Sequence, residues 1–234
     1  MRKRSMMWKA AVVLAATLIL GACGSSPQAR SITLTFIRHA QSEANASGII
    51  DTSEPGPGLS PEGKGQAEQV AHQLARNNYD AVYASTMARA QQTAAPLAAE
   101  LGKRVEVLPG LQEINAGWFE GKPVSTAPTT YLLAPADWLN GDVQNSIPGS
   151  ISGKAFNDRF TAAVQKIYDS GHSNPVVFAH LYSIEYWVLM NVKNAKDSLL
   201  TSHPLPNTGR VVITGNPSTG WTLVEWDGIR NFNG

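Results

Sequence analysis

The feature that most constrains the fold of this chain is a regular alternation of short apolar runs with helical patterns. Apolar, β-branched and small residues fill six runs that we predict as strands: 32–37, 81–84, 105–107, 176–179, 210–214 and 222–225. Apolar residues at helical spacing predict helices over 61–76, 87–101, 154–170 and 183–190. Such alternation predicts an α/β fold, a three-layer α/β/α sandwich with a mostly parallel central sheet.

Local signals mark where two of these helices begin and end. Ser60 is a good N-cap, Pro61 suits the first helical position, and Glu62 carries negative charge near the positive helix end. The second helix should stop at Gly102, and we expect Pro96 to kink or divide it because proline lacks the backbone N–H.

The segment 123–152 differs from the rest of the chain. It contains several proline, glycine, threonine and asparagine residues with short apolar islands between them. This composition predicts a long loop with short helical pieces. Because long loops in compact domains are often lids or substrate-facing elements, we expect this segment to face a ligand.

The N-terminal residues have the pattern of an export signal. Four cations, at positions 2, 3, 4 and 9, precede an apolar stretch at 10–20 that is too short to span a bilayer as a helix. The sequence Leu20-Gly21-Ala22-Cys23 then resembles a bacterial lipobox, in which the cysteine carries the lipid. We therefore predict a signal peptide over 1–22, a tether over 23–31 and one domain over 32–234. An ordinary signal peptide with an incidental Cys23 is the alternative.

These features predict a location and exclude some partners. A lipid on Cys23 would anchor the protein to the cell membrane on its extracytoplasmic face, and the membrane would be a partner. Cys23 is the only cysteine, so no intramolecular disulfide can form. Without residues 1–22, 15 basic residues stand against 18 acidic ones, a net charge of −3. This charge offers no basic surface for nucleic acid.

Polar side chains follow three of the predicted strands. Arg38 and His39 follow the first, Ser85 follows the second, and His180 follows the strand at 176–179. Arg89 lies just past Ser85 in the next helix. Since ligands in open α/β sheets bind at the carboxyl ends of strands, we expect Arg38, His39, Arg89 and His180 to share one pocket. Such a group of cation-capable side chains favours an anion, and phosphate matches the guanidinium fork.

Blocks of sequence in a fixed order carry a family resemblance. "RHAQSEAN" at 38–45 resembles the signature of the histidine phosphatase superfamily, the phosphoglycerate mutase-like proteins. Further similar blocks follow in order: "LSPEGKGQA" at 59–67, "STMARAQQTA" at 85–94, "EINAGWFEG" at 113–121, "IPG" at 147–149 and "VVFAH" at 176–180. The signal peptide and layout resemble a mycobacterial lipoprotein group of this superfamily.

The resemblance implies a phosphoglycerate mutase-like fold and a role for each site residue. His39 would attack phosphorus and form a phosphohistidine, and Glu113 would protonate the leaving alkoxide. The phosphoryl oxygens would be bound by Arg38, Asn45, Arg89 and His180. The substrate would be a small-molecule phosphomonoester, and no metal or other cofactor would be needed.

Each of these residues also has an ordinary structural interpretation. His39 could make only a structural hydrogen bond, and Glu113 could be a surface carboxylate, with Glu120 as a substitute acid. His72, His172 and His203 fit ordinary helix or loop positions. Aromatic residues could line the pocket or pack in the core: Trp118, Phe119, Trp138 and Tyr182.

Two positions and one motif depart from the family pattern. The first histidine is normally followed by glycine, and here Ala40 follows it; the second is normally followed by glycine or a small residue, and here Leu181 and Tyr182 follow it. The motif Pro148-Gly149-Ser150-Ile151-Ser152 lacks a usual carboxylate. A leucine after the second histidine could cost one backbone donor to phosphate, so we expect slow turnover. Two functions remain open: an anchored phosphatase, or a non-catalytic lipoprotein that binds phosphoryl ligands. A mutase acting on cytosolic substrates does not fit an exported chain.

Overall fold

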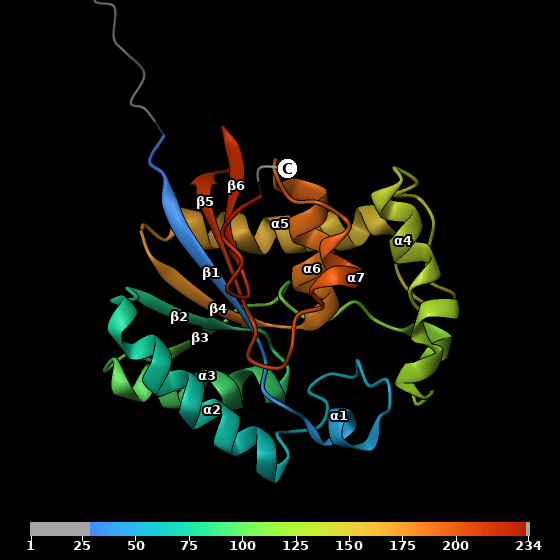
Figure 1. Cartoon of the computed structure of the whole chain (residues 1–234), viewed down its shortest axis with the longest axis horizontal. Helices are drawn as coiled ribbons and strands as arrows, with labels where there is room; N and C mark the ends of the chain where they lie inside the picture. The colour runs from blue at the N-terminus through green and yellow to red at the C-terminus, as the bar shows by residue number, and fades with distance from the viewer. Residues whose placement is uncertain (1–28, 233–234) are drawn as a thin grey trace, which may run out of the picture.

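The fold is described by a computed structural model, which covers residues 29–232. The predicted signal peptide, Cys23 and the first part of the predicted tether lie outside the described residues. Figure 1 shows a central sheet with helices on both sides. Within residues 29–232, no helix is both long and apolar enough to cross a membrane.

The sheet has six strands in the order β3-β2-β4-β1-β5-β6. Their bounds are β1 Ile32–Arg38, β2 Ala81–Ala84, β3 Val105–Val107, β4 Pro175–Ala179, β5 Arg210–Asn216 and β6 Gly220–Trp226. The first four strands of this order are parallel, whereas β5 pairs antiparallel with β1 and β6 antiparallel with β5. All six predicted strands and the mostly parallel sheet are confirmed.

The pairing register aligns the strand ends that carry polar residues. Arg38 at the end of β1 lies opposite Ala179 at the end of β4, and Ala84 of β2 lies opposite Phe178. The next residues, His39, Ser85 and His180, therefore emerge along one edge of the sheet.

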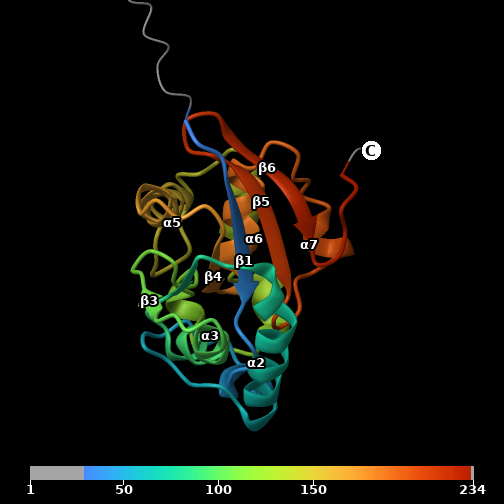
Figure 2. The same ribbon diagram turned by 90° about the vertical axis from the view of Figure 1, so that its left-hand side faces the viewer.

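Helices cover both faces of the sheet, which confirms the three layers (Figures 1 and 2). On one face lie α2 Pro61–Leu74 and α3 Ala88–Glu100, and on the other lie α4 Leu133–Leu139, α5 Gly153–Asp169 and α6 Leu181–Asn191. Successive strand residues alternate between these layers. In β1, Phe36 packs with the α5 and α6 layer, whereas Ile37 packs with the α2 and α3 layer.

Two helices can be compared with the sequence-based predictions. Of the two effects expected of Pro96, division of the helix is excluded, because α3 is one element whose apolar face, including Ala94 and Leu97, is buried against the sheet. The last major helix was predicted over 183–190, but α6 begins at Leu181, with the extended His180 as its N-cap. The predicted cap at Ser60 is confirmed, since its hydroxyl accepts the Gly63 N–H at 3.0 Å.

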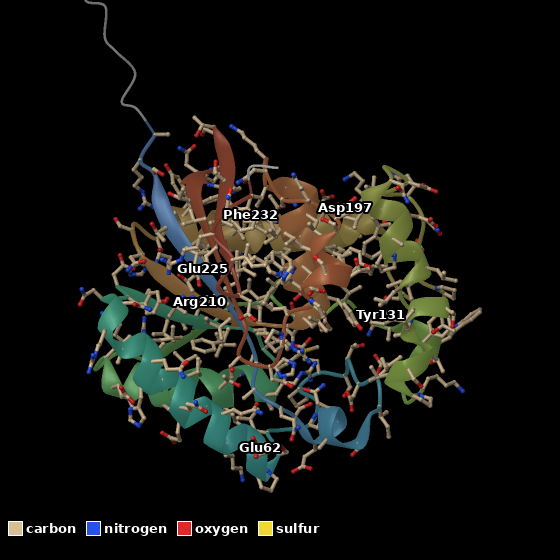
Figure 3. All side chains as sticks on the ribbon, viewed as in Figure 1. Glu62, Tyr131, Asp197, Arg210, Glu225 and Phe232 are labelled. Atoms are coloured by element: carbon tan, nitrogen blue, oxygen red, sulfur yellow. The ribbon has the colours of Figure 1, made fainter. Side chains whose placement is uncertain are left out.

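The segment 123–152 holds short helical pieces, as predicted: the 3₁₀ helix η3 Val124–Thr129 and α4. Other short elements are α1 Glu43–Ser47, η1 Ala75–Asn77, η2 Gly117–Phe119 and α7 Leu199–Ser202. At the antiparallel end of the sheet, Arg210 of β5 pairs with Glu225 of β6 (Figure 3).

Candidate functional site

A pocket opens at the sheet edge where β1 and β4 end. It is lined by residues from the β1–α1 region, the loop at 49–52, α3, η3 and the start of α6. Its polar wall includes Arg38, His39, Asn45, Arg89 and Glu113. Five of the six predicted catalytic and phosphate-binding residues therefore line one pocket, and the sixth, His180, lies directly behind His39.

The His39 ring is held with one nitrogen toward the pocket. Its Nδ1 lies 2.7 Å from the carbonyl oxygen of Ala40, and its Nε2 accepts a hydrogen bond from Arg89 Nε at 3.1 Å. These partners assign the proton to Nδ1 and the lone pair to Nε2. Burial, together with Arg89 and Arg38, holds the pKa of His39 well below its usual 6.5. The ring is therefore neutral at pH 7 and has the protonation state of a nucleophile.

Two guanidinium groups flank this ring, that of the partly buried Arg38 and that of the buried Arg89. Arg38 donates through Nη1 to the carbonyl oxygen of Leu205 at 2.7 Å, while its Nε has no partner among the described residues. Arg89 donates to the Asp51 carbonyl at 3.3 Å, and its Nη1 is likewise buried without a partner. Burial lowers the pKa of both arginines and Glu113 opposes this shift, yet an arginine stays charged at neutral pH. Both groups keep donors available for an anion.

His180 is fully buried beside His39, and their ring centroids are 5.1 Å apart. Its Nε2 lies 2.7 Å from Ser85 Oγ, which itself accepts the Met87 N–H at 3.2 Å. When the serine hydroxyl donates to Nε2, the ring proton lies on Nδ1. That Nδ1 is buried and has no partner among the described residues. In this tautomer His180 adds a third buried donor to the same cluster.

Asn45 is positioned by the short helix α1. Its Oδ1 accepts the Ser42 N–H at 3.2 Å, and Ser42 Oγ accepts the Asn45 N–H at 3.1 Å, which makes a capping box. The Asn207 amide also donates to Asn45 Oδ1, at 3.3 Å. Because the oxygen is used in this way, the amide nitrogen of Asn45 is the group left to donate into the pocket.

Glu113 is a buried carboxylate at the N-terminus of α6. Its Oε1 accepts the backbone N–H groups of Ile114 at 2.9 Å and Ser183 at 2.8 Å. Its Oε2 accepts the Tyr182 N–H at 3.2 Å, and Glu113 is one of the residues that line the pocket. Burial raises the pKa of Glu113, against the opposing effect of these N–H groups and Arg89. The interpretation as a surface carboxylate is wrong.

The described residues include no group of three or more His, Cys, Asp or Glu side chains arranged to hold a metal ion. Hydrogen-bonding capacity at the site is instead concentrated in the arginine, histidine and asparagine donors. An anion with several oxygens fits this donor set.

Comparison with known proteins identifies the family. The sequence profile of the histidine phosphatase superfamily (branch 1) matches residues 34–228. The chain belongs to this superfamily. A relative, the PE-PGRS family protein PE_PGRS11 of Mycobacterium tuberculosis, is 46% identical over 216 residues, which cover 86% of this chain. The chain spans 37% of the length of that relative.

Other members of the histidine phosphatase superfamily are more distant. Adenosylcobalamin/alpha-ribazole phosphatase of Escherichia coli is 28% identical over 149 residues, covering 63% of this chain and 72% of that protein. The structure of a mycobacterial glucosyl-3-phosphoglycerate phosphatase is similar with a TM-score of 0.69 and 20% identity, covering 86% of this chain and all of the other. A phosphoserine phosphatase from Entamoeba histolytica, in complex with 3-phosphoglyceric acid, gives 0.68 at 22% identity, covering 85% and 98%. These two structures support the fold alone.

Within this histidine phosphatase fold, the departures from the family pattern have separate consequences. Leu181 is the first residue of α6, so its backbone is an ordinary right-handed helix, and its side chain lines the pocket. Ala40 is buried, and its N–H donates to Thr93 Oγ1 at 3.0 Å. In the segment 148–152, Ser152 caps α5 and Ser150 donates to the Asn115 carbonyl. Of these departures, Leu181 reaches the pocket, as does its neighbour Tyr182.

The remaining candidates divide between pocket, core and surface. Tyr182 lines the pocket, whereas Trp138 is buried in the core and stacked on Phe156. Phe119 packs against the core as well, and Trp118 is 77% exposed. The three histidines expected to be ordinary do not line the pocket: His72, His172 and His203. Glu120 is not a substitute acid in this geometry, because it does not line the pocket and its carboxylate is turned to the N–H and hydroxyl of Thr52.

A second set of residues, which no motif in the sequence indicates, positions the site. The carbonyl oxygen of Leu205 accepts a hydrogen bond from Arg38, and the Leu205 N–H donates to the buried Glu185 carboxylate at 3.0 Å. Asn207 donates to the His39 carbonyl at 3.0 Å. These contacts join residues far apart in the chain, and only the fold brings them together.

Proposed function

We propose that the protein is a metal-independent phosphomonoester hydrolase that acts through a phosphohistidine on His39. Membership of the histidine phosphatase superfamily supports phosphoester hydrolysis. The observation that carries the proposal is the arrangement around His39 Nε2. Its lone pair accepts the Arg89 Nε–H, and the neighbouring Arg38, Arg89 and His180 each have a buried nitrogen that lacks a partner among the described residues.

In the first step, His39 Nε2 forms a bond to phosphorus while the bond from phosphorus to the ester oxygen breaks. Arg89 Nε, which now donates to Nε2, transfers its hydrogen bond to a phosphoryl oxygen as the substrate enters. Glu113 gives its proton to the leaving oxygen, so an alcohol departs rather than an alkoxide. The raised pKa of Glu113 favours the protonated form that this step requires.

In the second step, the Glu113 carboxylate takes a proton from water, and the water oxygen attacks phosphorus as the bond to Nε2 breaks. The products are orthophosphate and a neutral His39, with Glu113 protonated again. Arg38, Asn45, Arg89 and His180 stabilise the negative charge on the equatorial oxygens in both steps.

The covalent intermediate provides the test. Rapid quenching without acid, after mixing with a labelled phosphomonoester, should trap one phosphohistidine per chain. The His39→Ala protein should form none and should not turn over. His72→Ala, which removes a histidine with a 74% exposed side chain, is the matched control and should behave as the natural protein. Phosphate or vanadate binding without turnover in the natural protein would favour the non-catalytic binding lipoprotein instead.

We also propose that the enzyme is anchored through a lipid on Cys23 at the extracytoplasmic face of the cell membrane. The cationic start, the short apolar stretch and the sequence Leu20-Gly21-Ala22-Cys23 support this proposal. Detergent-phase partitioning of the natural protein and of Cys23→Ser tests it. The natural protein should enter the detergent phase, and equal recovery of both proteins in the aqueous phase would contradict anchoring.

A further inference from the structure

Beyond the phosphate-binding groups, the pocket wall is apolar. Side chains from α1, the loop at 49–52, η3 and the start of α6 contribute to it: Ala44, Ile49, Ile50, Val124, Ala127 and Leu181. The rings of Tyr131 and Tyr182 complete this wall and pack edge to face, with centroids 5.5 Å apart. Ile49 and Val124 are 40% and 41% exposed, although both are large apolar residues. The wall therefore continues to the surface of the molecule.

Two hydroxyl groups on this part of the wall, those of Thr52 and Tyr131, are already used within the protein, so among the described residues the Tyr182 hydroxyl is the tyrosine or threonine hydroxyl left to bind a ligand here. The Thr52 hydroxyl donates to Glu120 and accepts the Ala116 N–H at 2.9 Å. The Tyr131 hydroxyl, on the residue labelled in Figure 3, donates to the Ile114 carbonyl. A sugar or glycerol group bound here would lose hydrogen bonds to water and find few in exchange, which carries a free-energy penalty.

The charges that line the pocket disfavour a substrate whose organic part is acidic. Among the described residues that line the pocket, the only cations are Arg38 and Arg89, and both lie against His39 where the phosphoryl group binds. Asp51 lines the pocket beyond them, and its Oδ1 is held by the Ser53 N–H at 3.0 Å. A second carboxylate on the substrate would meet Asp51 and no additional cation.

We infer that the pocket selects phosphomonoesters whose organic part is an uncharged, apolar alkyl or aryl group. The inference rests on the proposed phosphatase function and specifies its substrate class. The apolar wall lies next to the phosphate-binding donors, so an alkyl or aryl chain leaving the ester oxygen would contact Ile49, Val124 and the two tyrosine rings. Removing that apolar surface from water provides the selectivity.

The test compares primary alkyl phosphates that have similar leaving groups: n-octyl phosphate, glycerol 1-phosphate and 3-phosphoglycerate. For the natural protein, kcat/KM for octyl phosphate should exceed that for glycerol phosphate by at least about tenfold, and 3-phosphoglycerate should be the poorest substrate. Calorimetric dissociation constants measured with the His39→Ala protein should follow the same order. This binding measurement reports the preference even if no ester is hydrolysed.

A positive charge placed on the wall should weaken the preference for the apolar ester over the acidic one. Val124→Lys should lower kcat/KM for octyl phosphate and raise it for 3-phosphoglycerate, changing their ratio by at least about tenfold. Val224→Lys is the matched control, because Val224 is 42% exposed on β6 and does not line the pocket. It should leave the ratio unchanged.

The outcomes separate the two proposals. If the three esters are hydrolysed equally well and Val124→Lys does not change their ratio, the substrate class is wrong and the phosphatase function stands. If no ester is hydrolysed but the His39→Ala protein still binds octyl phosphate most tightly, the phosphatase function fails and the apolar preference stands. Equal binding of all three by that protein would overturn the preference.

Discussion

Glu185 offers a quantitative test of the electrostatics around the site. The residue lies on α6 and is 3% exposed. Its Oε1 accepts a hydrogen bond from the Leu205 N–H, and the Leu205 carbonyl oxygen in turn accepts one from Arg38. Burial raises the pKa of Glu185 to about 7 from an ordinary value of 4.5, although the Leu205 N–H and Arg38 oppose the shift. We consider the replacement Glu185→Gln, which keeps an acceptor for Leu205 and cannot ionise.

The magnitude follows from the two pKa values. Because the folded state holds the proton more tightly than the unfolded state, the stability tied to the neutral form is complete below about pH 4.5. It is lost as the pH rises to about 7. Between pH 5 and pH 8, ionisation of Glu185 should lower the free energy of unfolding by about 2.5 kcal/mol. The glutamine variant should escape this loss.

Urea denaturation at pH 5 and at pH 8 measures the effect. At pH 5 the two proteins should differ by less than about 1 kcal/mol, and at pH 8 the variant should have gained about 2.5 kcal/mol relative to the natural protein. Glu68→Gln on the exposed face of α2 controls for the loss of one negative charge. If the natural protein and Glu185→Gln lose stability in parallel between the two pH values, the carboxyl does not have a raised pKa and our reasoning is refuted.

The remaining predictions concern the chemistry, the pocket and the packing. Activity needs neutral His39 and protonated Glu113, whose pKa values burial lowers and raises respectively, so kcat/KM should peak at weakly acidic pH. Glu113→Gln should reduce kcat by about 10²–10⁴-fold, and a rate that keeps rising to pH 9 would contradict this assignment. Leu181→Gly should raise kcat/KM about tenfold by opening the pocket, at some cost in stability; steady-state kinetics without a gain would show that the leucine does not impede turnover. Gly63→Ala should destabilise by about 2 kcal/mol in thermal unfolding, because a Cβ there would lie 1.9 Å from the Gln41 carbonyl oxygen. Gly65→Ala in the same helix meets nothing within 4 Å and should not destabilise.

The strands and the residues of the local signature could be predicted because their information is local. Val176–Ala179 is buried on both faces, and such strands are continuous apolar runs. Arg38, His39 and Asn45 lie within one short block, and the parallel register places the end of β1 beside the end of β4. The strand order and this local signature were therefore enough to predict that Arg38, His39 and His180 lie close together.

The errors arose where distant contacts decide local structure. The start of α6 has no side-chain cap from a neighbouring residue. Glu113, far away in the chain, accepts the N–H groups of Tyr182 and Ser183 instead, so the helix begins two residues before the predicted Ser183. Pro96 removes one helical hydrogen bond from α3, but burial of the apolar face of the helix outweighs that loss. The first compensation comes from a residue distant in the chain, and the second depends on the sheet against which α3 packs.

The direction of β1 has a consequence for how the enzyme would meet its substrate. The strand enters at the top of Figure 1 and ends at the pocket, about 20 Å away for its seven residues. A lipid on Cys23 would therefore attach to the end of the domain opposite the pocket, and the nine peptide units from Cys23 to Ile32 can span at most about 30 Å. With the domain upright on its tether, the opening would face the aqueous phase and would receive esters that arrive by diffusion. Because the reach of the tether exceeds the length of β1, the same anchor would also let the domain tip its pocket toward the bilayer.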